Sequence, residues 1–352
     1  MSTTTVQLEE PKISSIKLPS GQTVTVKSEA SVEADEIPII DVSPIWGDDL
    51  EAKKAVAEQI REAAHRIGFF YAQHPVHTPG IESKYAKAAF KQGKRFCDLP
   101  VEKKLEVDTA RVPVEYVGYH KLQGYNRNGR KNNDLSEAFN WAYDARYDPE
   151  AVDKTEPSIS IWPSDLPGFK DDLYAYHTEL LRFARRMMGI FALALHMPED
   201  YFDEYTKRPE AGMRIIHYPE QEASATDQNG IGAHTDFECF TVVTQDDCGG
   251  LEVLNKAGYW IKAKPVPDAF VVNIADCFMR QTNDFFVSTV HRVVNKSGRE
   301  RFSIPFFFGF NRSKRLEAIP SCVSEENPMK YAIMTSGEYY HYRATNAKSG
   351  SY

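Results

Sequence analysis

The sequence predicts an α+β protein with a mostly β core and helices packed against it. Segments with the apolar spacing of amphipathic helices precede Gly212, and short apolar runs separated by turn residues follow it. Several strands at regular spacing, with turns between them, are typical of an antiparallel sandwich or barrel. Because the helices come first and most strands come later, we expect a single β core with a helical layer on it.

Four segments are predicted to be helical, because their apolar residues recur at every third or fourth position or because they begin with a favourable proline. Gly68 ends the first helix, and Pro100 lies in the first turn of the shortest one. The predicted helices cover residues 50–66, 81–96, 100–104 and 171–195.

Runs of β-branched and aromatic residues predict the strands. Two of these runs lie early in the chain, at residues 37–42 and 69–72. Residues 108–165 are rich in glycine and proline, and we expect a long aromatic-bearing loop there, either a pocket wall or a surface connection. The later predicted strands cover residues 213–218, 240–244, 251–254, 269–274 and 302–308.

Composition excludes several classes of protein. The formal net charge of -8 and the pI near 5.8 argue against a nucleic-acid or anionic-membrane surface. No apolar run is long enough for a membrane span, and the polar, acidic first residues lack a signal-peptide pattern. Five cysteines without paired spacing argue against a disulfide framework. We therefore expect a cytoplasmic globular protein.

A candidate metal site begins at the segment Gly232-Ala-His-Thr-Asp236. His234 and Asp236 are two positions apart, so on a strand or extended loop they project to the same side. A third ligand is available from His291, which lies among β-branched residues further along the chain. Two histidines and one carboxylate on one face leave coordination positions open, which is the arrangement of non-haem Fe(II) oxygenases. A buried structural histidine is the alternative at His291 if it is taken alone.

A candidate anion site follows ten residues later, on the predicted strand that begins at Arg301. Alternation along this strand places Arg301, Ser303, Pro305 and Phe307 on one face. A guanidinium can bind a carboxylate through two parallel hydrogen bonds, and a neighbouring hydroxyl can add a third. Such a pair is suited to the distal carboxylate of 2-oxoglutarate, although Arg301 alone is also compatible with a structural ion pair.

Together, His234-Thr-Asp236, His291 and Arg301-x-Ser303 resemble the isopenicillin N synthase-like family of 2-oxoglutarate/Fe(II)-dependent dioxygenases. The resemblance covers roughly residues 36–312. The flanking segments that agree are His217-Tyr-Pro219, Gln245-Asp-Asp-Cys-Gly-Gly-Leu-Glu-Val253, Asn273-Ile-Ala-Asp276, Thr282-Asn-Asp284, Ile37-Pro-Ile-Ile-Asp41 and Ile67-Gly-Phe-Phe70.

This resemblance implies a double-stranded β-helix (jelly roll) with packed N-terminal helices. It also implies Fe(II) bound by the catalytic residues His234, Asp236 and His291, and 2-oxoglutarate bound by Arg301 and Ser303. Tyr218 matches a family tyrosine that contacts the oxoacid, so it is a further cofactor-binding candidate. The expected reaction uses O2 to hydroxylate, desaturate or cyclise a small organic metabolite, with succinate and CO2 as co-products.

Five consecutive regions are expected from these assignments. They are a flexible N-terminal arm (1–35) with a short strand at residues 23–26, an N-terminal dioxygenase region with helices and pocket loops (36–150), a helical support (151–207), the Fe(II)/2-oxoglutarate jelly-roll core (208–312) and a C-terminal tail (313–352) that is a candidate pocket cover.

Aromatic residues are the candidates for a substrate pocket, and ordinary core packing is the alternative for most of them. Phe307 has the best case, because it shares a strand face with Arg301. The remaining candidates are Phe237, Tyr116, Tyr119, Phe139 and Trp141.

Other functions remain open at this stage. An Fe(II) oxidase of the same fold that does not use 2-oxoglutarate shares the Arg-x-Ser pair. A zinc hydrolase accepts the same three ligands, and a catalytically silent binding protein can keep the fold. We expect a small-molecule substrate, no nucleic-acid or membrane partner, and a monomer or weak homo-oligomer. The overall pattern of the sequence resembles fungal pyrimidine hydroxylases and fungal tailoring enzymes of secondary metabolism.

Overall fold

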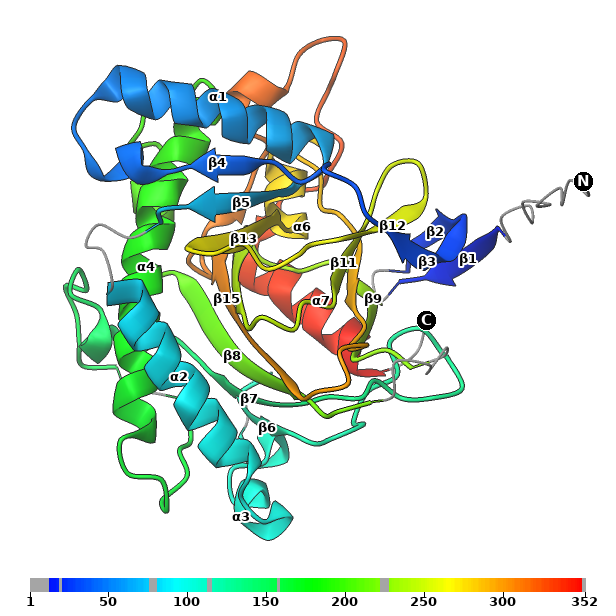
Figure 1. Ribbon diagram of the computed structural model, residues 1–352. Helices are drawn as coiled ribbons and strands as arrows, with labels where there is room; N and C mark the ends of the chain where they lie inside the picture. The colour runs from blue at the N-terminus through cyan, green and yellow to red at the C-terminus, as the bar shows by residue number, and fades with distance from the viewer. Residues whose placement is uncertain are drawn as a thin grey trace, which may run out of the picture.

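The computed structural model describes residues 13–18, 21–75, 81–112, 116–156, 159–221 and 228–349. Two β-sheets face each other across an apolar interior, and helices cover the outer face of the larger sheet (Figure 1). The predicted α+β class with a mostly β core is confirmed.

The larger sheet has eight strands, and only its β4–β5 pair is parallel. In spatial order, the strands are β4 (Ile39–Asp41), β5 (Phe69–Gln73), β13 (Ala269–Ile274), β10 (Phe240–Gln245), β15 (Arg301–Gly309), β8 (Glu210–Tyr218), β7 (Glu137–Trp141) and β6 (Gly118–His120).

The smaller sheet has five strands and carries two of the three candidate metal ligands. In spatial order, they are β3 (Ser28–Val32), β12 (Tyr259–Lys262), β11 (Leu251–Leu254), β14 (His291–Val293) and β9 (Ile231–His234). Two further pairs are the hairpin of β1 (Ser14–Lys17) and β2 (Thr23–Val26), and β16 (Arg315–Leu316) with β17 (Met334–Thr335). Val26 of the hairpin joins an apolar cluster with Trp260 and Leu254 on the small sheet.

Alternation along the strands of the larger sheet separates a core face from a site face. On β15, Phe306 and Phe308 belong to the cluster shared with the helices, whereas the intervening Phe307 lines an interior cavity. On β8, Ile215 faces the helices and Tyr218 faces the smaller sheet. Each strand therefore contributes to the core with one face and to the site with the other.

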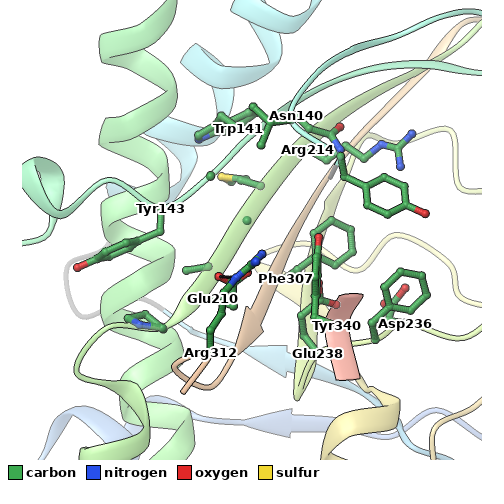
Figure 2. A pocket seen from close by; sticks show the side chains of 18 of the residues that line it. Asn140, Trp141, Tyr143, Glu210, Arg214, Asp236, Glu238, Phe307, Arg312 and Tyr340 are labelled. Carbon is green, nitrogen blue, oxygen red and sulfur yellow. Dashed lines mark hydrogen bonds and ion pairs between the residues drawn. The ribbon is translucent and has the colours of Figure 1, made fainter. Parts of the chain in front are cut away.

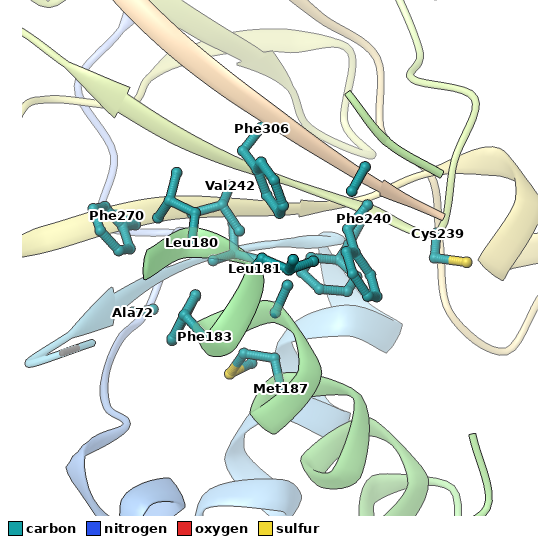
Figure 3. Packing of buried hydrophobic residues seen from close by; sticks show 14 of the residues in the cluster. Ala72, Leu180, Leu181, Phe183, Met187, Cys239, Phe240, Val242, Phe270 and Phe306 are labelled. Carbon is teal, nitrogen blue, oxygen red and sulfur yellow. The ribbon is translucent and has the colours of Figure 1, made fainter. Parts of the chain in front are cut away.

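The helical layer is built from α1 (Leu50–Arg66), α2 (Ile81–Cys97) and α4 (Phe169–Ala194). Figure 3 shows Leu181 and Met187 of α4 beneath Phe240, Val242 and Phe306 of the sheet. Burial of these large apolar side chains is the main force that holds the helices on the sheet. The remaining α-helices are α3 (Val101–Leu105), α5 (Asp203–Thr206), α6 (Asp276–Gln281) and α7 (Ser336–Ser349).

Both ends of α1 are fixed by local chemistry, which is why its predicted bounds are correct. The Asp49 side chain caps the first turn by accepting from the backbone N–H groups of Glu51 and Ala52. Gly68 has φ +69°, and a Cβ there would lie 2.1 Å from the backbone oxygen of Val287. Any side chain at this position would displace the backbone at Val287.

Two expectations differ from the structure. Within the predicted N-terminal arm, residues 14–32 contain β1, β2 and β3 rather than a single short strand. Tertiary contacts order this polar segment, since Arg292 binds the Glu29 carboxylate at 2.7 Å and its backbone oxygen at 2.6 Å. Residues 1–12 and 19–20 of the arm lie outside the described residues.

The second difference lies in the predicted loop, residues 108–165, which contains β6 and β7. Glu137 and Asn140 interrupt the apolar pattern of β7, so the strand is set by its pairing with β8 rather than by its own sequence.

The prediction that the chain has no disulfide framework is confirmed, because all five cysteines are free. None of the described helices is long and apolar enough to span a membrane.

Glu137 on β7 anchors a buried polar network beneath α2. Its carboxylate accepts from Lys104 (2.8 Å), Tyr119 (2.7 Å) and His217 (3.0 Å). Burial raises the pKa of Glu137, but the hydrogen bonds from His217, Lys104 and Tyr119 outweigh it and lower this pKa to about 2. Since these partners satisfy the carboxylate, this group is a structural network rather than a metal site.

We expect the stabilisation by Glu137 to be present above its unfolded-state pKa of about 4.5 and to be lost as pH falls toward 2. The native state holds the carboxylate ionised, so protonation favours unfolding. The free energy of unfolding of wild type and Glu137→Gln, measured in urea from pH 6 to pH 3, should differ most at pH 6 and converge as the pH falls. A constant difference over this range would contradict the network described here.

Candidate active site

Three candidate metal ligands meet at the edge of the smaller sheet. The pairing of β14 with β9 places His291 opposite His234, and Asp236 follows β9 by two residues. The Nε2 atom of His234 lies 3.6 Å from Oδ1 of Asp236, and the Nε2 atom of His291 lies 3.7 Å from the same oxygen. All three ligand atoms lie within 4.8 Å of one another, which is a spacing that one metal ion can bridge.

The backbone fixes the orientation of both imidazoles. Nδ1 of His234 lies 2.8 Å from the carbonyl oxygen of Gly232, and Nδ1 of His291 lies 3.1 Å from that of Thr289. A carbonyl can only accept, so each Nδ1 carries the proton and each Nε2 has its lone pair free. These tautomers are the ones that metal binding requires.

The two oxygen atoms of the Asp236 carboxylate have different surroundings. Its Oδ2 atom accepts from the Thr241 hydroxyl at 2.6 Å and from the Asn273 amide at 2.9 Å. The Oδ1 atom faces the two histidines. Since outer-sphere hydrogen bonds of this kind orient a ligating carboxylate, Thr241 and Asn273 are candidate positioning residues.

Burial and charge keep His234 and Asp236 in the protonation states of metal ligands. Burial lowers the pKa of His234 to about 3, with a smaller contribution from the nearby His291. Burial raises the pKa of Asp236, but the two histidines and the hydrogen bonds from Thr241 and Asn273 outweigh it, so this pKa lies below its usual value. At neutral pH, His234 is therefore neutral and Asp236 is ionised.

Arg301 forms the second part of the site, on the inner face of β15. This side chain is only 1% exposed and lies 4.6 Å from the Tyr218 ring centre. Its Nε donates to the Gly249 carbonyl, and one Nη donates to Gln245 at 3.2 Å. Its other Nη is buried and has no hydrogen-bond partner among the described residues. An unpaired guanidinium nitrogen inside a protein indicates a missing anionic or polar ligand.

Ser303 and Tyr218 lie beside Arg301, as the sequence predicts. The two hydroxyl oxygens are 3.4 Å apart, and pairing of β15 with β8 places Arg301 opposite Tyr218. A guanidinium flanked by two hydroxyls is suited to one end of a dicarboxylate. These donors therefore fit the distal carboxylate of 2-oxoglutarate.

A cavity of about 740 Å³ opens beside the candidate metal ligands. It is lined by His234 and Asp236, by the inner faces of β7 and β8, and by Tyr340 of α7 (Figure 2). This volume is in the range of small-molecule sites. A pocket of suitable size therefore lies directly beside the candidate metal ligands.

Four of the six aromatic pocket candidates line this cavity: Phe307, Phe237, Tyr116 and Trp141. Tyr119 and Phe139 do not line it, so this part of the prediction is wrong. Both belong to the cluster under the helices, where Phe139 packs 5.0 Å from Phe96 and the Tyr119 hydroxyl donates to Glu137. Alternation along β6 and β7 turns these two side chains away from the site face. Trp141 borders the cavity, but it has the same parity on β7 as Phe139, and its ring packs in the same cluster, 6.3 Å from the Phe139 ring.

Several residues of the site were not predicted, although the sequence contains a signal for some of them. Arg214 and Tyr218 have the same parity on β8, and Arg214 is a charged residue within an apolar run. Thr241 similarly interrupts the apolar residues of β10. Asn140 had no such signal, because β7 itself was not predicted.

Helix α7 contacts the segment of the candidate metal ligands through Arg343. This guanidinium pairs with Asp276 and donates to the Thr235 hydroxyl at 3.4 Å, and Thr235 donates to Asp276 at 3.0 Å. Arg343 also lies 4.6 Å from the Phe237 ring centre. Because Thr235 and Phe237 flank Asp236 in the chain, α7 contacts both neighbours of a candidate ligand.

Family comparisons agree with this geometry. A model of the 2OG-Fe(II) oxygenase superfamily matches residues 209–310, which include all three candidate metal ligands and both Arg301 and Ser303. A second model, described as the non-haem dioxygenase in morphine synthesis N-terminal region, matches residues 37–165.

Individual relatives extend the match over nearly the whole chain. The 2-oxoglutarate-Fe(II) type oxidoreductase ppzC of Metarhizium rileyi is 36% identical, covering 94% of each chain, and hxnY of Emericella nidulans is 34% identical, covering 85% of this chain and 86% of its own. A full-length Neurospora crassa protein, crystallised in complex with alpha-KG and thymine, is 27% identical in sequence to this chain. The two structures match with a TM-score of 0.77, over 90% of this chain and 99% of that chain. Their shared fold confirms the predicted double-stranded β-helix. The chain therefore belongs to the 2-oxoglutarate/Fe(II)-dependent oxygenase superfamily, whose members are oxidoreductases that use Fe(II), 2-oxoglutarate and O2.

Proposed function

We propose that this chain hydroxylates, desaturates or cyclises a small organic metabolite, with Fe(II) held by His234, Asp236 and His291. The observation that carries the proposal is the convergence of the three ligand atoms within 4.8 Å, beside a cavity of about 740 Å³. In the same proposal, Arg301, Ser303 and Tyr218 bind 2-oxoglutarate, and succinate and CO2 are the co-products. Secondary metabolism is the expected setting, because two fungal oxidoreductases are among the relatives.

Iron and 2-oxoglutarate together supply the oxidising power to attack a C–H bond of the substrate. The protein residues supply geometry. His234, His291 and Asp236 would hold the metal, and Arg301 would bind the far carboxylate of the oxoacid. Phe307, Phe237 and Tyr340 place aromatic surface along the cavity, which holds an apolar part of the substrate and excludes water.

Helix α7 is proposed to cover the pocket, since Tyr340 lines the cavity and Arg343 ties the helix to Asp276.

Five free cysteines suit a reducing compartment, so we propose a cytoplasmic enzyme. The net charge of -8 suits a protein without nucleic-acid or membrane partners. We further propose a monomer or weak homo-oligomer.

Membership of the superfamily favours the oxygenase over a zinc hydrolase or a catalytically silent binding protein. It also favours an enzyme that uses 2-oxoglutarate over an Fe(II) oxidase that does not use it. Relatives are named for 2-oxoglutarate, and the Neurospora crassa protein was crystallised with alpha-KG. The unpaired Nη of Arg301 supports the same choice, since it indicates a missing anionic or polar ligand at the site, and a carboxylate of 2-oxoglutarate would supply one.

Anaerobic loading with Fe(II) and 2-oxoglutarate should give a visible charge-transfer band, and exposure to O2 should give succinate. His234→Ala and Asp236→Ala should remove both signals, because two ligands hold the metal less well than three. The measurements are absorption spectroscopy and succinate quantification. Wild-type protein that gives neither band nor succinate would overturn the proposed function.

Arg301→Met is expected to raise the KM for 2-oxoglutarate by roughly 30-fold or more, because one partner of a buried charge pair is lost. Fe(II) affinity without 2-oxoglutarate should stay within about twofold, since Arg301 does not touch the metal ligands. Steady-state kinetics and metal titration give the two values. Equal weakening of metal and oxoacid would point to misfolding instead of lost co-substrate binding.

Thr241→Val should weaken Fe(II) binding by about 10- to 100-fold, because the hydrogen bond that orients Asp236 is removed. Thr244→Val is the matched control. Thr244 lies on the same strand, but its hydroxyl bonds Tyr176 of α4 on the opposite face. Anaerobic calorimetry measures both affinities, and similar losses in the two variants would argue against a positioning role for Thr241.

A further inference from the structure

Arg214 is a buried arginine in the cavity wall that lacks a charge partner. It lies on β8, is 8% exposed and contributes to the lining of the cavity. Among the residues that the structure describes, it forms no ion pair and no side-chain hydrogen bond, and its Nε atom is fully enclosed. Burial of an unpaired charge is strongly unfavourable, so retaining one at a pocket wall indicates a ligand that completes it.

Asn140 adds a second unpaired group next to Arg214. The two residues are direct partners across β7 and β8, so their side chains project from neighbouring positions of the same face. The Oδ1 atom of Asn140 is also enclosed without a hydrogen-bond partner within the described part of the chain. Figure 2 shows the two side chains together on one side of the cavity, away from Asp236 and Tyr340.

Other arginines around the cavity have carboxylate partners, which makes Arg214 the exception among them. Arg127 pairs with Asp134, and Arg312 binds Glu210 through two contacts of 2.6 and 3.0 Å. Arg208 similarly pairs with Glu156. Burial lowers the pKa of Arg214, and the Arg127 cation lowers it further. An arginine still remains charged at neutral pH, so the charge must be balanced by something else.

The proposed cofactors do not balance it. The two positive charges of Fe(II) and the one of Arg301 are cancelled by the single charge of Asp236 and the two charges of 2-oxoglutarate. The loaded centre is therefore neutral, and the guanidinium of Arg214 remains uncompensated. A neutral substrate would leave the charge of Arg214 unbalanced, whereas a carboxylate would neutralise it through charge-assisted hydrogen bonds.

The position of Arg214 also suits a substrate anchor. Thr241, which bonds Asp236, pairs with Phe307, and Phe307 pairs with Gly212, two residues before Arg214. Two strand spacings and two residues thus separate Thr241 from Arg214, or roughly 12 Å between Cα atoms. Both side chains point into the interior. A small acid held by Arg214 can therefore place a C–H bond near the metal ligands.

We propose that Arg214 binds the carboxylate of the substrate and that the Asn140 amide rotates to donate its Nδ2–H to the same carboxylate, so that this enzyme oxidises small organic acids. The proposal rests on the proposed oxygenase function and names its substrate class. The aromatic side chains of Phe237, Phe307 and Tyr340 then contact the apolar remainder of the acid. In this proposal Arg301 binds the co-substrate, and Arg214 binds the substrate.

Matched pairs of carboxylic acids and their primary amides provide the test, with aliphatic, aromatic and amino-acid members such as 3-phenylpropionate and 3-phenylpropionamide. Binding to the anaerobic Fe(II)–2-oxoglutarate enzyme is followed by the change in its absorption band and by ligand-observed NMR. The acids should bind better than the amides. Arg214→Gln should weaken acid binding by roughly 30-fold or more, with amide binding changed by less than about twofold.

Arg312→Gln is the matched control, because it removes a positive charge from the same cavity at a residue that Glu210 already neutralises. It should change acid binding by less than about twofold. Arg214→Gln should melt no lower than wild type, since it removes an uncompensated buried charge. If the absorption band is normal but the acids bind no better than the amides, this inference alone is overturned. The same holds if wild type and Arg214→Gln bind the acids equally well. Loss of the band in wild type instead overturns the proposed function.

Discussion

Two-residue alternation along the strands of the eight-stranded sheet is the constraint on which both the core and the site depend. The outward positions of β8 and β15 carry Ile215 and Phe306, which anchor the helical layer. The inward positions of the same strands carry Arg214, Tyr218 and Arg301. A shift of one residue in register would exchange these sets, placing two guanidinium groups in the core and removing the apolar contacts of α4. The packing of the helices therefore also fixes the orientation of the polar site.

This alternation explains why much of the fold and the site could be predicted from the sequence. The helix at residues 50–66 has its cap and its terminating glycine in the sequence, and the shared face of Arg301 and Ser303 follows from their spacing. His234, Asp236 and His291 were identified by residue type. Their convergence, however, depends on the pairing of β9 with β14, which no local pattern specifies.

The errors have a common physical origin, because they fall where tertiary pairing overrides local sequence. β7 is a strand because β8 and β6 lie on either side of it, although Glu137 and Asn140 break its apolar pattern. Without that strand, Tyr119 and Phe139 could not be assigned to the core face, nor Asn140 to the site face. The N-terminal strands likewise depend on distant partners such as Arg292.

The pairing of His234 with His291 has a kinetic consequence. β5 pairs with β13 across about two hundred residues of sequence, and β9 pairs with β14 across more than fifty. The entropy of closing such long loops must be overcome before these contacts begin to stabilise the chain, so sheets of this topology fold slowly. The candidate metal ligands are thus brought together by a pairing across more than fifty residues, within a fold whose larger sheet also depends on a pairing across about two hundred. We infer that a nascent chain gains its helices well before it gains the ability to hold iron.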